Sequence, residues 1–259
     1  MAEEARRQGW RVVALVFGEA PGLDGAVDRL VPCRLSDIGA ALETIRQEGI
    51  KSVVFAGTLP KPELIAALPR DAHGRRFLAQ GGQFTDASLS RATLEALEGV
   101  GVRVLDQRVF LAPLLASGGV LTARAPAPAE WEDIAVGLRL ARQCAAFGVG
   151  QTVVIQGGAV VAVEAMEGTD DAIRRGCALG GPGAVVVKAV SPRHDYRFDV
   201  PTVGEATIDS MVWGKALVLA MESGRVLLLD RQAVIERANR HGIAIVGVDA
   251  DFATGPQAG

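Results

Sequence analysis

Short apolar runs alternate with amphipathic stretches along the whole chain. In the first half, valine-rich runs bounded by glycine or polar residues predict strands over residues 11–17, 51–56 and 102–105. Between these runs, apolar residues recur at helical spacing after candidate N-caps, which are Ser36 for one helix and Thr85 or Asp86 for another. The repeated strand–helix order predicts an α/β domain with a Rossmann-like, open parallel sheet.

The start of the chain is unusual for such a domain. Residues 2–10 have the pattern of the last turns of a helix, with Gly9 as the residue that closes it. Because a domain of this kind normally opens on a strand, we expect that its first strand is missing.

The second half of the chain has a different pattern of predicted elements. Two apolar runs, 152–156 and 159–164, flank Gly157-Gly158, which is the pattern of a β-hairpin with a two-residue loop. Hairpins mixed with helices predict a second α/β domain with a mixed sheet. A stretch of alternating proline and alanine lies over residues 122–129, so we predict two domains, 1–125 and 126–259.

Composition narrows the class of function. The chain has 259 residues, of which 49% are hydrophobic and 5% aromatic, and its net charge of −3 gives no electrostatic case for binding nucleic acid. The three cysteines are isolated, which suits a reducing compartment. No apolar run approaches the length of a membrane span, and no signal peptide opens the chain, so we expect a cytoplasmic protein.

Most candidate functional residues lie between residues 164 and 204. In Gly168-Thr169-Asp170-Asp171, Thr169 is well placed as a helix N-cap, and capping is the more common explanation. The alternative is that the helix start holds a phosphate through its backbone N–H groups. Nearby, Glu164 and Glu167 offer carboxylates of the kind that bind Mg²⁺, although Glu164 can equally be exposed and inert.

Asp199 and Lys188 are the other charged candidates. Asp199 lies between Phe198 and Val200, so we expect burial to be costly unless the carboxylate is paired or binds a metal. Lys188 ends a valine run and can pair with Asp199 or with a phosphate, or can be a lysine at the edge of a sheet.

Gly57-Thr58 ends a predicted strand of the first domain, where a glycine allows a ligand to approach the backbone, or simply forms a turn. The three histidines are scattered, which excludes a histidine-based triad or zinc site, and no Walker A or dinucleotide-binding glycine motif is present.

Taken together, these motifs resemble the UDP-2,3-diacylglucosamine pyrophosphatase family of the LpxI type. The resemblance lies in residues 55–62 (FAGTLPKP), Gly150-Gln151, residues 163–170 (VEAMEGTD), Val187-Lys188, residues 198–204 (FDVPTVG), residues 229–231 (LDR) and residues 247–249 (GVD). It covers nearly the whole chain, and the combination of the EGTD and DVPTVG motifs is specific where neither would be alone.

The resemblance implies a homodimer of two-domain α/β chains that clasp the product lipid between the domains. It implies that a lipid-linked UDP-sugar is hydrolysed to UMP and 2,3-diacylglucosamine 1-phosphate, with Mg²⁺ or Mn²⁺ as the cofactor. The family's essential aspartate corresponds to Asp199, as a metal ligand, with Glu164 or Glu167, or as a general base. The expected substrate-binding residues are Gly57, Thr58, Gly168, Thr169, Asp170, Lys188 and Thr202.

Two alternatives remain open from the sequence. One is an enzyme that hydrolyses a different nucleotide-sugar or phosphosugar on the same scaffold. The other is a non-catalytic protein that binds or senses a phospholipid or nucleotide-sugar. A lipid substrate also suggests peripheral contact with the inner membrane, although no amphipathic anchor stands out.

Overall fold

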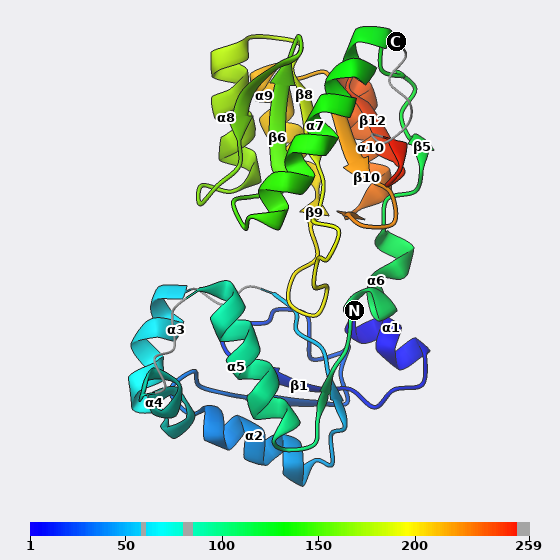
Figure 1. The fold of residues 1–259 in the computed structure, drawn as a ribbon. Coiled ribbons are helices and arrows are strands. Elements are labelled where there is room, and N and C mark those ends of the chain that lie inside the picture. Colours follow the sequence, from blue (N-terminus) through cyan, green and yellow to red (C-terminus); the bar gives the residue numbers. More distant parts are fainter. Residues whose placement is uncertain (58–60, 80–84, 253–259) are drawn as a thin grey trace. The chain divides into compact units, whose positions relative to one another are not determined.

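The computed structural model describes residues 1–57, 61–79 and 85–252, in two compact units (Figure 1). The first unit comprises Met1–Leu111 together with Tyr196–Asp199, and the second comprises Ala112–Asp195 and Val200–Gly259. The boundary expected at residues 125 and 126 falls inside the second unit, because strand β5 (Gly119–Val120) pairs with β12 (Ala244–Val248).

The first unit contains parallel strand pairs and helices, which confirms the α/β class. Strand β1 (Val13–Val16) pairs with β2 (Arg29–Pro32), and β3 (Ser52–Val53) pairs with β4 (Arg103–Val104), both in parallel. The helices of this unit are α1 (Ala2–Arg7), α2 (Ile38–Gln47), α3 (Lys61–Ala67), α4 (Ala72–Ala79), α5 (Asp86–Glu98) and α6 (Arg108–Leu111), with a 3₁₀ helix over Leu68–Arg70.

The helix caps of this unit test the sequence signals directly. Thr85 is the N-cap of α5, as predicted, and its hydroxyl accepts a hydrogen bond from the N–H of Ser88 at 3.2 Å. The expected cap of α2 was wrong by one residue, because the carboxylate of Asp37 accepts from the N–H of Ala40. The expected apolar face is confirmed, since Leu42 and Ile45 are buried in the core of the unit.

The second unit is built on the predicted mixed sheet. Its strand order is β5-β12-β10-β8-β6-β7, in which β8, β10 and β12 are parallel and β6 runs antiparallel to β7 and β8. The strands newly named here are β6 (Thr152–Gln156), β7 (Ala159–Val163), β8 (Val185–Lys188) and β10 (Val218–Glu222). A smaller parallel pair joins β9 (Thr202–Val203) to β11 (Leu227–Leu228).

Helices cover both faces of this sheet (Figure 1). The 19-residue helix α7 (Pro128–Ala146) packs on one face, where Ile134 and Leu138 meet the side chains of Val153 and Val187. The opposite face is covered by α8 (Thr169–Gly180), α9 (Glu205–Gly214) and α10 (Arg231–Arg240). Adjacent residues of each strand therefore enter different cores, as expected for a sheet buried on both sides.

Close approach of helix and sheet depends on glycine. A Cβ atom on Gly137 of α7 would lie 2.5 Å from Cγ2 of Val187, and one on Gly176 of α8 would lie 2.8 Å from Cβ of Val154. The predicted hairpin is also confirmed, with Gly157 and Gly158 at φ values of 56° and 79°. No helix within the described ranges of the chain has the length and apolar character needed to cross a membrane.

Candidate active site

A buried polar cluster lies in the second unit, at the end of strand β8. Nζ of Lys188 lies 2.7 Å from Oγ1 of Thr169, 3.3 Å from Oγ1 of Thr152 and 3.9 Å from Oε2 of Glu164. The hydroxyl of Thr169 donates to Oε1 of Glu164 at 2.9 Å, and the N–H of Gln151 donates to Oε2 at 3.3 Å. Lys188 is only 4% exposed, so its ammonium depends on these partners in place of water.

The sheet topology brings these side chains together. Thr152 at the start of β6 is paired with Lys188 at the end of β8, and the N–H of Glu164, just after β7, donates to the carbonyl of Thr152 at 2.8 Å. The neighbouring Gly150 is packed against this point, because a Cβ there would lie 2.1 Å from the carbonyl oxygen of Glu164. The alternative that Lys188 lies at the edge of a sheet is wrong, since β8 is a central strand.

Thr169 does not have the capping role that its sequence position favours. The N-cap of α8 is Gly168, which adopts a φ of 85° that favours glycine, and Thr169 is the first helical residue. The threonine hydroxyl is therefore available to link Lys188 to Glu164. Capping by Thr169 is therefore wrong, and phosphate binding at this helix start stays a prediction.

Two acidic residues follow in the first turn of α8. Asp171 forms an ion pair with Arg174 at 2.9 Å. Oδ1 of Asp170 is buried and finds no hydrogen-bond partner among the described residues. A buried carboxylate oxygen without a donor is costly unless a ligand or cation satisfies it, so Asp170 retains its place as a candidate binding residue.

The carboxylate of Glu167 is neutralised by a neighbouring arginine. Glu167 forms an ion pair with Arg175, which also donates to the carbonyl of Val163, and its carboxylate accepts from the N–H of Ala165. The hydrogen bond from Arg175 holds the pKa of Glu167 below its ordinary value. Across the described residues, no group of three or more histidine, cysteine, aspartate or glutamate side chains is arranged to hold a metal ion.

Asp199 belongs to the first unit, at the end of the four-residue segment Tyr196–Asp199. The ring of Phe198 stacks on that of Phe55, with centroids 5.3 Å apart. The guanidinium of Arg108 lies 3.6 Å from the ring centroid of Tyr196. Asp199 itself is exposed, so the expectation that its carboxylate suffers a cost of burial is wrong.

Gly57, the other candidate of the first unit, lies two residues after Phe55. Its φ of 83° requires glycine at the end of this segment, as expected for a turn or for close approach of a ligand. Thr58 lies outside the described residues. In the second unit, the hydroxyl of Thr202 donates to the carbonyl of Val200 at 2.8 Å.

Sequence reasoning missed two further features of the second unit. Thr152 joins the Lys188 cluster only through the pairing of β6 with β8, which the pattern of residues did not specify. Glu222, which the sequence places beside a turn, ends β10 and is fully buried, where it pairs with Arg142 at 2.7 Å. The sequence did contain a signal for Glu222, because the apolar run before it ends in a charged residue, as the run before Lys188 does.

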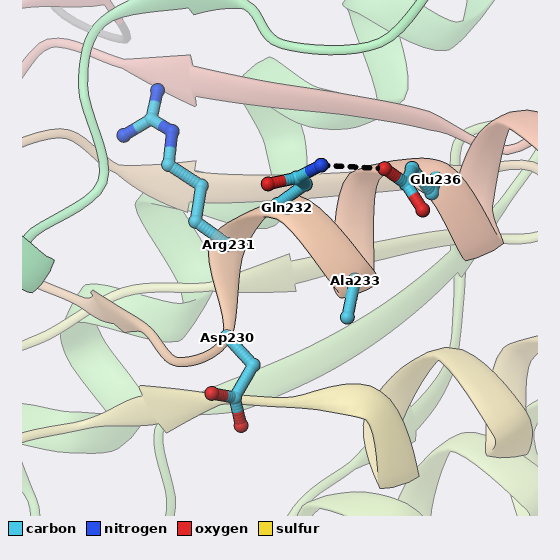
Figure 2. A pocket seen from close by; sticks show the side chains of 5 residues that line it. All are labelled: Asp230, Arg231, Gln232, Ala233 and Glu236. Atoms are coloured by element: carbon cyan, nitrogen blue, oxygen red, sulfur yellow. Dashed lines mark hydrogen bonds between the residues drawn. The ribbon is translucent and has the colours of Figure 1, made fainter.

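A separate, open pocket of about 440 Å³ lies at the first turn of α10. Figure 2 shows the side chains of Arg231 and Gln232 at this helix start, with Gln232 hydrogen-bonded to Glu236 at 2.9 Å. The lining residues are Asp230, Arg231, Gln232, Ala233 and Glu236, and none of them was a predicted site residue.

Comparisons with known proteins cover both units. Residues 1–114 match the model of the LpxI N-terminal domain, and residues 117–246 match the model of the LpxI C-terminal domain. The chain is 33% identical over 226 residues to the UDP-2,3-diacylglucosamine pyrophosphatase LpxI of Caulobacter vibrioides. That alignment covers 83% of this chain and 80% of the relative.

Proposed function

Because the chain belongs to the LpxI family, we propose that it hydrolyses the pyrophosphate bond of UDP-2,3-diacylglucosamine in lipid A biosynthesis. The products are UMP and 2,3-diacylglucosamine 1-phosphate. The observation that carries this proposal is the buried Lys188–Thr169–Glu164 cluster at a helix start, in a chain that matches the family over both units.

The cluster suits a phosphoryl group. Hydrolysis of a pyrophosphate requires neutralisation of phosphoryl oxygens and positioning of a water molecule. The ammonium of Lys188 supplies positive charge, and the first backbone N–H groups of α8, after Gly168, have no acceptor within the helix. Glu164 orients Thr169 and Lys188 through its two carboxylate oxygens. We assign phosphate binding to Gly168, Thr169 and Lys188.

Asp199 is the proposed catalytic residue. Its carboxylate is exposed, and the docking of Phe198 on Phe55 fixes the backbone next to it. An exposed carboxylate can hold a divalent cation or accept a proton from the attacking water. Both roles predict that removal of this charge stops turnover.

A divalent cation, Mg²⁺ or Mn²⁺, is part of the proposal. Glu167 fits poorly as a ligand because Arg175 neutralises it, whereas Asp170 offers a buried oxygen without a hydrogen-bond partner in the described part of the chain. Glu164 offers a further anionic oxygen in the same unit, although it shares its charge with Lys188. When bound, such a cation neutralises charge on phosphoryl oxygens.

Two exposed apolar side chains, close in sequence to residues of the cluster, suit a lipid substrate. Phe147, at the end of α7, is 84% exposed, and Met166, two residues after Glu164, is fully exposed. We propose that they contact the acyl chains or the inner membrane, as part of a cytoplasmic protein that binds the membrane peripherally. We also propose that the chain forms a homodimer. The exposed side chain of Val160 on the outer strand β7 supports an association of two copies at this edge of the sheet.

The proposal is tested by measuring UMP released from UDP-2,3-diacylglucosamine in mixed micelles, with Mg²⁺ or with a chelator. We expect turnover that stops on chelation and in Asp199→Asn. Tight binding of the lipid product without turnover by the native chain would instead favour the sensor alternative. If the chain hydrolyses a different nucleotide-sugar but not UDP-2,3-diacylglucosamine, the proposed reaction class is supported and the proposed substrate is wrong.

A further inference from the structure

A second charged cluster in the second unit is centred on Glu222, at the end of β10. Its side chain is 0% exposed. Oε1 accepts from Nε of Arg142 at 2.7 Å and from Nη1 of Arg225 at 3.5 Å, while Oε2 accepts from the backbone N–H of Val190 at 2.8 Å. Arg225 in turn donates through Nη2 to the carbonyl of Ser191 at 2.6 Å.

These contacts hold the start of the segment that carries Asp199. Val190 and Ser191 follow directly after β8, where the chain leaves the sheet and begins the excursion that returns at β9, drawn in yellow in Figure 1. Val190 is completely buried, so its backbone N–H has no access to water and depends on Glu222.

The end of the same segment is held by the residues that follow Arg225. The N–H of Leu227 donates to the carbonyl of Pro201 at 2.8 Å, and β11 continues this contact by pairing with β9. The N–H of Leu229 donates to the carbonyl of Val203 at 2.9 Å. One short stretch, residues 222–229, therefore binds both ends of the excursion.

Stability alone does not account for a buried ion cluster. Replacing a buried ion pair by apolar residues of similar volume is often neutral or stabilising, because the attraction of the charges barely exceeds the cost of removing them from water. Apolar packing cannot, however, satisfy the N–H of Val190 and the carbonyl of Ser191 in one defined geometry. The cluster specifies the path of the chain at this point.

We propose that Glu222 and Arg225 are positioning residues for Asp199. They fix the start of residues 190–201, while Leu227 holds the end, and this limits the conformations of the segment that carries the carboxylate. This inference rests on the proposed catalytic role of Asp199.

The test compares Glu222→Gln and Arg225→Met with the native chain in the UMP-release assay, together with melting temperature and hydrogen–deuterium exchange. Arg225→Met leaves the pair between Arg142 and Glu222 intact, so it is the variant expected to fold normally. Arg225→Lys tests rescue, because its ammonium can still reach a carbonyl. Arg139→Met, an exposed arginine on the same helix as Arg142, is the matched control.

We expect Arg225→Met and Glu222→Gln to lower kcat by about 10- to 100-fold with little change in KM, since misplacement of a catalytic group acts on the chemical step. Exchange should become faster in peptides covering residues 191–199, and Arg225→Lys should recover part of kcat. If Arg225→Met and Glu222→Gln both keep the native kcat while Asp199→Asn is inactive, the inference is wrong and the proposed function still holds. The same follows from a loss of kcat that matches the loss of folded protein.

If Asp199→Asn turns over normally, the catalytic role of Asp199 is wrong. Hydrogen–deuterium exchange then shows whether Glu222 and Arg225 still hold residues 190–201 in place. Unchanged exchange in Arg225→Met and Glu222→Gln overturns that as well.

Discussion

Lys188 and Thr169, the last residue of a central strand and the first residue of a helix, share a hydrogen bond of 2.7 Å between Nζ and Oγ1. The bond ties the ammonium to the point where the free N–H groups of α8 begin. A phosphoryl group bound there would meet the full charge of the ammonium together with the partial charge of the helix start, and both favour an anion.

Replacing Lys188 by methionine should separate the catalytic and structural roles of this cluster. We expect kcat/KM to fall by about 10- to 100-fold, because hydrogen bonds to charged groups contribute about 1.5–3 kcal/mol. The melting temperature should also fall, since Glu164 is left without its cation. Adding Glu164→Gln removes that unpaired charge, so the double variant should regain stability but not activity. Recovery of activity in the double variant would contradict the phosphate-binding role.

Substituting serine for Phe147 and Met166 should weaken binding to lipid. Each side chain buries enough apolar surface in a membrane to change affinity by about tenfold. The measurement is flotation with vesicles of phosphatidylethanolamine and phosphatidylglycerol, beside hydrolysis of the substrate in detergent. Serine at Trp213, which is 64% exposed on α9, provides the control. Equal flotation of the native chain and the double variant would reject the membrane contact at these residues.

Asp71 should make the first unit sensitive to acid. Burial disfavours its charged form, but hydrogen bonds from the N–H groups of Gly39, Gly74 and His73 outweigh burial and hold its pKa below the ordinary value of 3.8. Because the pKa is lowered in the folded state, the ionised carboxylate of Asp71 stabilises the fold. This stabilisation is complete above about pH 4 and disappears as the pH falls through the folded-state pKa.

Asp71→Asn should therefore cost about 1 kcal/mol of stability at pH 7, as for the loss of a helix cap, and progressively less at lower pH. Urea unfolding at pH 7, 5 and 3 measures this difference. A difference that is independent of pH would show that the charge of Asp71 is not what these N–H groups stabilise.

Gly137→Ala should destabilise the second unit by about 1–3 kcal/mol, because the new methyl group would collide with the side chain of Val187. Val187→Ala alone should also destabilise, since it leaves a cavity. Combining the two changes should cost less than their sum, because the second change makes room for the first. Thermal unfolding of the four proteins gives the coupling, and simple additivity would contradict the contact.

Local signals in the sequence predicted most elements of the fold. The Gly157-Gly158 hairpin was predicted correctly, and Thr85 was one of the two caps predicted for its helix, because each depends on neighbouring residues. The N-cap at Gly168 was missed because Thr169 fits the same local pattern, and only the positive φ of the glycine decides between them.

The site could be predicted only in part for the same reason. Glu164, Thr169 and Lys188 were identified one by one, but their mutual contacts depend on the pairing of three strands. Glu222 was overlooked because its partner Arg142 lies 80 residues away in the chain. Nothing local to either residue indicates that pair.

The inclusion of Tyr196–Asp199 in the first unit bears on how the two halves of this protein can be inherited. The family models divide at residues 114 and 117, which suggests two exchangeable modules. A gene cut there leaves Phe198 in one product and its stacking partner Phe55 in the other. Recombination between distant relatives would pair an aspartate with a foreign docking surface, so selection should keep both modules together and let them diverge only as a pair.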